Sequence, residues 1–102
     1  MKTYDKLVRD LIPDIIQGSG KTCECSVMEE QAYRKALGQK LIEEAKEFEC
    51  GPCEEEIADV LEVIDALCAS YGYDMKRILQ IKADKKAERG GFEKRIFLHN
   101  VR

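Results

Sequence analysis

Four carboxylates in the middle of the chain have the spacing of a metal site. Glu44 and Glu47 form one pair three residues apart, and Glu56 and Asp59 form a second pair with the same spacing. Residues three apart are neighbours on the surface of a helix, so each pair would present both carboxylates together. Carboxylate oxygens are the ligands that hard cations such as Mg²⁺ and Mn²⁺ prefer. The two pairs therefore predict a divalent-cation site.

The helical projection turns both pairs toward apolar side chains. With Leu37 as the origin and about 100° per residue, Glu44 lies about 20° away, inside the apolar stripe, and Glu47 lies about 80° away, at its edge. In the next helical segment Glu56 falls within the apolar arc and Asp59 just beyond it. A charged group that faces a core is costly unless it is paired or coordinated.

A turn at Gly51-Pro52 would bring the two pairs to the same height. Glu47 precedes this turn by about the same number of residues as Glu56 follows it, and the same holds for Glu44 and Asp59. In an antiparallel helical hairpin the pairs would therefore lie opposite each other. Without a cation, four converging carboxylates would repel one another.

The acidic residues also have a simpler interpretation. Residues 54–56 occupy the first turn of a helix, where acids are favoured by the helix dipole alone. Residues 43–49 would form a solvated face if they pair with Lys40 and Lys46. Spacing alone leaves both interpretations open.

We expect four helices and two short strands, and these elements must position the four carboxylates. A short helix over residues 10–16 has Pro13 in its first turn. Ser26-x-x-Glu29 is a capping box, which predicts a second helix from about residue 27 to 49. Further helices are expected over about 53–71, ending at Gly72, and from the Asp74 cap to about residue 89. Alternation over residues 21–27 and 92–98 predicts a two-stranded β-hairpin. The expected fold is an all-α helical bundle with this minor hairpin, in a single domain over residues 1–102.

Length and charge exclude several classes of protein. A chain of 102 residues has the size of one domain, and its net charge of −3 disfavours a dedicated nucleic-acid binder. No apolar run approaches the roughly 20 residues of a transmembrane helix. The charged N-terminus lacks the apolar stretch of a signal peptide. We therefore expect a cytoplasmic protein with no membrane and no nucleic-acid partner.

The cysteines leave three interpretations open. Their number is odd and no export signal precedes them, so a disulfide framework is not expected. The CxC and CxxC spacings would suit four thiolates on zinc, a redox dithiol at the CxxC, or incidental thiols. The five residues are Cys23, Cys25, Cys50, Cys53 and Cys68.

Three segments carry a resemblance to a known family. Residues 43–47 (EEAKE) followed by 56–59 (EIAD) resemble the EExxE…ExxD motif of the all-α nucleotide pyrophosphohydrolases, which include MazG-like proteins. Residues 4–13 resemble the KLVRDKIP opening of a small MazG-like subgroup, labelled phosphoribosyl-ATP pyrophosphohydrolase-like, and residues 89–98 resemble its usual ending. The eight residues between the two halves of the motif are fewer than the family usually has.

The resemblance implies a MazG-like bundle that cleaves a nucleoside triphosphate between its α- and β-phosphates. The products would be the monophosphate and pyrophosphate, the cofactor Mg²⁺ (Mn²⁺ as a substitute), and the assembly a homodimer or homotetramer. The implied metal ligands and catalytic residues are Glu44, Glu47, Glu56 and Asp59. Any of these, or Glu43, would take the proton of the attacking water.

Basic residues that would bind the phosphates fall into two sets. Lys82, Lys86 and Arg89 share a face of the fourth helix, where cations are also favoured by the helix dipole alone. The resemblance adds Lys6, Arg9 and Lys94. Two other functions remain open: phosphoribosyl-ATP hydrolysis in histidine synthesis, and a non-catalytic helical module held by zinc that binds a partner or oligomerises. Nothing in the sequence identifies the residues that would read the base.

Overall fold

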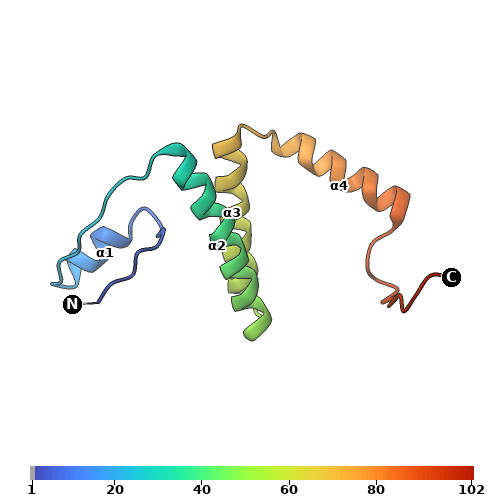
Figure 1. Ribbon diagram of the computed structural model, residues 1–102, viewed down its shortest axis with the longest axis horizontal. Coiled ribbons are helices and arrows are strands. Elements are labelled where there is room, and N and C mark those ends of the chain that lie inside the picture. The colour runs from blue at the N-terminus through green and yellow to red at the C-terminus, as the bar shows by residue number, and fades with distance from the viewer. Residues whose placement is uncertain (1) are drawn as a thin grey trace. The chain divides into compact units, whose positions relative to one another are not determined.

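The computed structural model describes residues 2–102, and these form four helices and no strand (Figure 1). The helices are α1 (Ile12–Gly18), α2 (Glu30–Cys50), α3 (Glu54–Tyr71) and α4 (Met75–Arg89). The predicted all-α class is confirmed. No helix in the described part of the chain is both long enough and apolar enough to cross a membrane.

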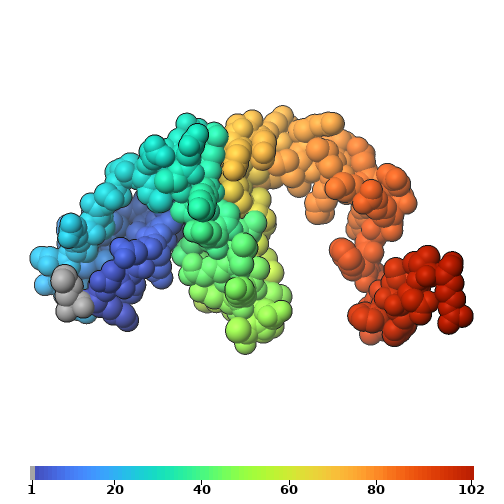
Figure 2. Space-filling model, in the orientation of Figure 1, coloured from blue at the N-terminus to red at the C-terminus, as the bar shows by residue number. Residues whose placement is uncertain are grey.

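The chain divides into two units, the first ending at Gly72 and the second comprising Tyr73–Arg102. In the first unit α2 and α3 lie side by side as an antiparallel hairpin whose connection contains Gly51 and Pro52 (Figure 1). The N-terminal segment approaches one side of this hairpin (Figure 2), and Ile12 and Ile15 of α1 help to line a groove there. The second unit contains α4 and the C-terminal residues.

The interior of the first unit is small. Leu37 of α2 and Val63 and Cys68 of α3 are the buried apolar side chains among residues 2–102. One charged side chain, Glu44, is buried with them and is only 7% exposed. The helical projection therefore placed Glu44 correctly in the apolar stripe of α2.

Local sequence explains three of the helix ends: the start of α1, the end of α3 and the start of α4. Pro13 lies in the first turn of α1, where its missing N–H costs no hydrogen bond. Gly72 ends α3 in the left-handed region, with φ of 70°, a conformation that glycine adopts without steric cost. Asp74 caps α4, because its side chain accepts a hydrogen bond of 3.0 Å from the backbone N–H of Lys76.

Two local expectations are corrected. Residues 21–27 and 92–98 contain no strand, so the predicted β-hairpin is wrong for this structure. The two segments belong to different units, and a lone two-stranded hairpin is marginally stable without further strands. The capping box is also wrong: α2 begins at Glu30, its N-cap Glu29 makes no side-chain cap, and Ser26 lies three residues earlier.

Candidate functional site

The hairpin brings the four predicted carboxylates together. Ligand oxygens of Glu44, Glu56 and Asp59 all lie within 4.8 Å of one another, and those of Glu43, Glu44 and Glu47 do so as well. Glu44 belongs to both groups and links them. We call Glu44, Glu47, Glu56 and Asp59 the carboxylate cluster.

Two oxygens of the carboxylate cluster are buried without a hydrogen-bond partner. They are Oε2 of Glu44 and Oε2 of Glu56, one from each helix of the hairpin. A buried polar atom without a partner carries an uncompensated desolvation cost, and native proteins rarely leave one in place. The structure therefore supports the metal-site interpretation over a solvated acidic face at these two positions.

The pKa values of these two carboxyls are raised. Burial is the main cause for Glu44, and the neighbouring carboxyl of Glu47 raises its pKa further, whereas Lys40 acts in the opposite direction. For Glu56, desolvation again comes first, followed by the charges of Glu47 and Asp59. Both shifts show that the site disfavours its own negative charge when no cation is present.

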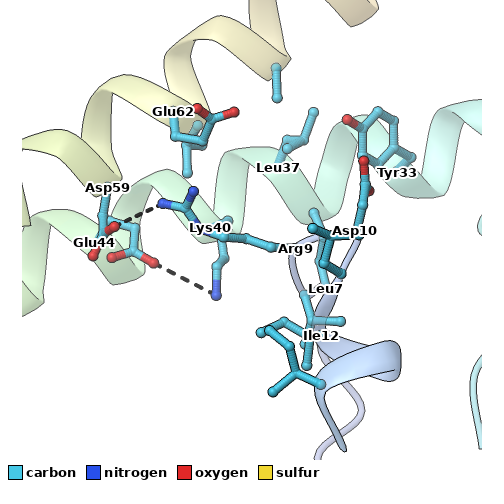
Figure 3. Close-up of a pocket in the computed structure, with 15 residues that line it drawn as sticks. Leu7, Arg9, Asp10, Ile12, Tyr33, Leu37, Lys40, Glu44, Asp59 and Glu62 are labelled. Carbon is cyan, nitrogen blue, oxygen red and sulfur yellow. Dashed lines mark hydrogen bonds and ion pairs between the residues drawn. The ribbon is translucent and has the colours of Figure 1, made fainter. Parts of the chain in front are cut away.

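Two cationic side chains approach the carboxylate cluster (Figure 3). Lys40 lies one turn before Glu44 on α2, with its Nζ 3.7 Å from Glu44 Oε1 and 3.6 Å from Glu43 Oε1. Arg9 reaches in from the N-terminal segment, and its Nη2–H donates a hydrogen bond of 2.8 Å to Asp59 Oδ1. Two cations near four carboxylates leave the site negatively charged.

A groove of about 530 Å³ opens beside the carboxylate cluster, between the N-terminal segment and the helical hairpin. Arg9, Lys40, Glu44 and Asp59 lie at its charged end, whereas Tyr33 lies at the other end of the residues drawn in Figure 3. The span from Tyr33 to Glu44 along α2 is roughly 16 Å at 1.5 Å per residue. The groove can therefore take an elongated ligand, with Arg9 and Lys40 near one end and Tyr33 beside Asp10 at the other (Figure 3).

The donor set fits a hard divalent cation. All candidate ligand atoms are carboxylate oxygens, as Mg²⁺ and Mn²⁺ require, and they come from both helices. The two partnerless oxygens supply unused lone pairs inside the site. A divalent ion would offset the excess negative charge and lower the raised pKa values of Glu44 and Glu56.

Of the other predicted phosphate-binding residues, one belongs to the first unit, and no contact in the described part of the chain places it at the carboxylate cluster. Lys6 lies over the ring of Tyr4, 5.8 Å from its centroid. The second unit contains the remaining four residues, which are exposed: Lys82, Lys86, Arg89 and Lys94. Of these, Lys86 is 3.8 Å from Glu93, and a role for the set in phosphate binding stays a prediction.

The cysteines do not form a four-thiolate site. Cys23 and Cys25 approach each other at 3.8 Å between their sulfurs, and burial together with Cys25 raises the pKa of the Cys23 thiol. In the part of the chain that the structure describes, the groups with metal-ligand geometry contain glutamate and aspartate alone. Cys50 and Cys53 are exposed at the connection between α2 and α3.

Sequence reasoning missed the groove and the roles of two residues in it. Lys40 was weighed only as the partner of a solvated face, although its spacing of four from Glu44 is the signal for an ion pair. Glu62, which the sequence pattern did not single out, is exposed and also lines the groove. No periodicity could have placed Tyr33 and Leu7 in one groove, because the N-terminal segment meets α2 only through the tertiary fold.

Comparisons with known proteins add no relative to this description. No protein-family model matches the chain, and neither the curated proteins nor the solved structures contain a match. The site's own geometry therefore carries the functional argument, and the resemblance to MazG-like proteins stays a prediction.

Proposed function

We propose that this protein is a Mg²⁺-dependent nucleotide pyrophosphohydrolase of the MazG-like type, which cleaves nucleoside triphosphates between the α- and β-phosphates. The observation that carries this proposal is the pair of buried, partnerless oxygens of Glu44 and Glu56 within the carboxylate cluster. Such oxygens favour a cation as the missing partner. The groove beside them offers space for a ligand with a charged end.

Each residue of the site has a role in this proposal. Glu44, Glu47, Glu56 and Asp59 would hold the ion from both helices. When bound, Mg²⁺ would supply neutralisation of phosphate charge and activation of a water for attack. A carboxylate of the cluster or the adjacent Glu43 would accept the proton of the attacking water. At the charged end of the groove, Arg9 and Lys40 would orient the phosphates by hydrogen bonding.

The test is a panel of canonical and modified nucleoside triphosphates, incubated with the purified protein with and without Mg²⁺. Phosphorus NMR resolves the products. Monophosphate plus pyrophosphate, formed only with Mg²⁺ and lost in Asp59→Asn, would support the proposal. Release of inorganic phosphate alone would mean a different bond is cleaved and would contradict it. Loss of turnover counts only where circular dichroism shows that Asp59→Asn keeps its helical content.

Phosphoribosyl-ATP is a second substrate for the same panel. Turnover of this compound with no turnover of nucleoside triphosphates would move the protein to histidine synthesis, with the same metal chemistry. Inactivity toward every compound would favour a helical binding module. The cysteine geometry gives the zinc-held form of that module no support, because no described thiol belongs to a metal-ligand group.

The amount of exposed surface supports a homo-oligomer. The chain exposes 9592 Å², whereas two separately compact units of these sizes would expose about 6,900 Å² together. Large apolar side chains contribute to the excess, including Ile42, Ile57 and Leu61 on the hairpin and Phe92 in the second unit. A partner in a standard interface buries about 800 Å². We propose that a second copy covers part of this surface in a homodimer or homotetramer; a monomer by light scattering at micromolar concentration would contradict it.

The cytoplasm remains the location predicted for this activity, because the substrate and the cation are both available there. A fluorescent fusion of the full chain tests this directly, and a signal confined to another compartment would contradict it.

A further inference from the structure

Arg9 supplies a cation that the carboxylate cluster holds in the structure. Its guanidinium donates a hydrogen bond of 2.8 Å to Oδ1 of Asp59, across a sequence separation of fifty residues. The N-terminal segment that carries Arg9 also forms one wall of the groove. The same side chain therefore contacts a candidate metal ligand and borders the space where a ligand would bind.

The contact between Arg9 and Asp59 is of a kind that a divalent ion can displace. Their side chains are 59% and 38% exposed, and ion pairs with this exposure shift an equilibrium by only about two- to fivefold. A divalent ion carries twice the charge and can contact carboxylates of both helices at once. Lys40, by contrast, is anchored on α2 itself and its side chain is only 20% exposed, so it is the less mobile of the two cations.

We propose that Arg9 competes with the divalent cation for Asp59, and that the displaced guanidinium then binds a phosphate group of the ligand in the groove. This inference rests on the proposed function, since it takes the carboxylate cluster to hold a cation. A guanidinium presents a planar fork of donors that matches phosphate oxygens, and Arg9 already lines the groove. Arg9 would thus be a ligand-binding residue that couples ion binding to phosphate binding.

If Arg9 competes with the ion, one variant should bind the ion more tightly and the nucleotide more weakly. Arg9→Gln removes the competing charge, so Mn²⁺ alone should bind about two- to fivefold more tightly, as measured by calorimetry. At saturating Mn²⁺, an α,β-methylene nucleoside triphosphate, which cannot be cleaved at the bond in question, should bind about tenfold more weakly to Arg9→Gln. A merely structural role of Arg9 would move both affinities in the same direction.

Lys21→Gln is the matched control, because it removes one exposed positive charge from the same unit. It should leave both affinities within twofold of the wild type. Weaker or unchanged Mn²⁺ binding in Arg9→Gln would overturn the competition. If Mn²⁺ binding is lost in Glu44→Gln but unchanged in Arg9→Gln, the proposed function survives and the role of Arg9 does not. If the wild type binds no Mn²⁺, both fail together.

A measurement on the unaltered protein guards against a variant that does not fold. When Mn²⁺ displaces Arg9, the N-terminal segment loses a contact with α3, so the amides of residues 7–12 should exchange hydrogen faster with Mn²⁺ than without it. Unchanged or slower exchange at saturating Mn²⁺ would contradict the displacement.

Discussion

Charged side chains at the two ends of the α2–α3 hairpin differ in how far their charge is compensated by partners from the chain. Toward the start of α2, Arg34 has several partners from the chain itself: it donates hydrogen bonds to Glu30, to the carbonyl oxygen of Ser70 and to the Ser70 hydroxyl, and it lies 4.6 Å from the ring centroid of Tyr71. Toward the turn, the carboxylate cluster keeps two buried oxygens with no partner.

This difference separates a structural contact from the proposed cation site. The charge of Arg34 is compensated by groups that the fold itself supplies, so the contact ties α2 to α3. The charges of Glu44 and Glu56 are compensated only in part, since Lys40 and Arg9 pair with other oxygens of the site. Buried carboxylate oxygens without a partner are rare in native proteins, and this is the observation on which the proposed cation site rests.

The largest effect is expected for a substitution in the carboxylate cluster. Glu56→Gln removes one charge from a half-buried ligand position and should lower kcat/KM for the best nucleotide by at least about 100-fold, because a metal would supply several kcal/mol of transition-state stabilisation. Steady-state assays with Mg²⁺ measure this. The control Asp65→Asn removes the same charge from an exposed position of α3, and a comparable loss there would contradict a specific role for Glu56.

A smaller effect is expected for a substitution of Arg34, which forms the structural contact between α2 and α3. Arg34→Met keeps the bulk of the side chain but loses its hydrogen bonds and its contact with Tyr71, so the free energy of unfolding should fall by about 1–3 kcal/mol. Chemical denaturation measures this, with Lys35→Met on the exposed face of α2 as the control.

The affinity of folded Arg34→Met for Mn²⁺ should stay within twofold of the wild type. A selective loss of ion binding with unchanged stability would reverse the roles that the comparison assigns to the two regions.

The metal-free protein should become more stable as the pH falls. The pKa values of Glu44 and Glu56 are raised in the folded state, so the folded protein binds protons more tightly than the unfolded chain. This stabilisation is present below the ordinary pKa of a glutamate and is lost as the pH rises through the raised values. Melting temperatures in a chelator, measured from pH 7 down to about pH 5, should therefore rise.

Glu44→Gln should flatten this pH dependence and raise the metal-free melting temperature at pH 7 by a few degrees. It should also abolish the stabilisation that added Mn²⁺ gives the wild type. A steeper pH dependence in Glu44→Gln would contradict the assignment of the buried charge to Glu44.

The smallest effect is expected at the exposed thiols. Cys50→Ser should change the free energy of unfolding by less than about 0.5 kcal/mol, as is usual for exposed positions. Zinc content by plasma mass spectrometry should be no higher in the wild type than in Cys50→Ser. Stoichiometric zinc that is lost in Cys50→Ser would favour a zinc-held module instead.

The sequence predicted what depends on local geometry. Helix periodicity placed Glu44 in the apolar stripe, and the turn at Gly51-Pro52 set the register that brings it near Asp59. The end of α3 followed from Gly72 and the start of α4 from Asp74. The conformation of the first and the side chain of the second act within a few residues. These interactions are short in sequence, so a pattern of residue types is enough to indicate them.

The rest depends on contacts between distant residues. The resemblance suggested Arg9 as a phosphate-binding residue, but its contact with Asp59 spans fifty positions and has no periodic signal. The groove likewise forms only where the N-terminal segment meets α2. The structure has no strand at the two predicted segments, because alternation over seven residues does not supply the neighbouring strands that stabilise a pair.

The proposed cation site is best tested by the binding of Mn²⁺ to the metal-free protein, followed by electron paramagnetic resonance. We expect the wild type to bind Mn²⁺ and Glu44→Gln and Glu56→Gln to lose this binding. Glu49→Gln and Asp65→Asn, which remove the same charge from exposed positions of the two helices, should retain it. Equal losses in all four variants would reduce the site to a diffuse negative surface. No binding by the wild type would contradict the cation site altogether.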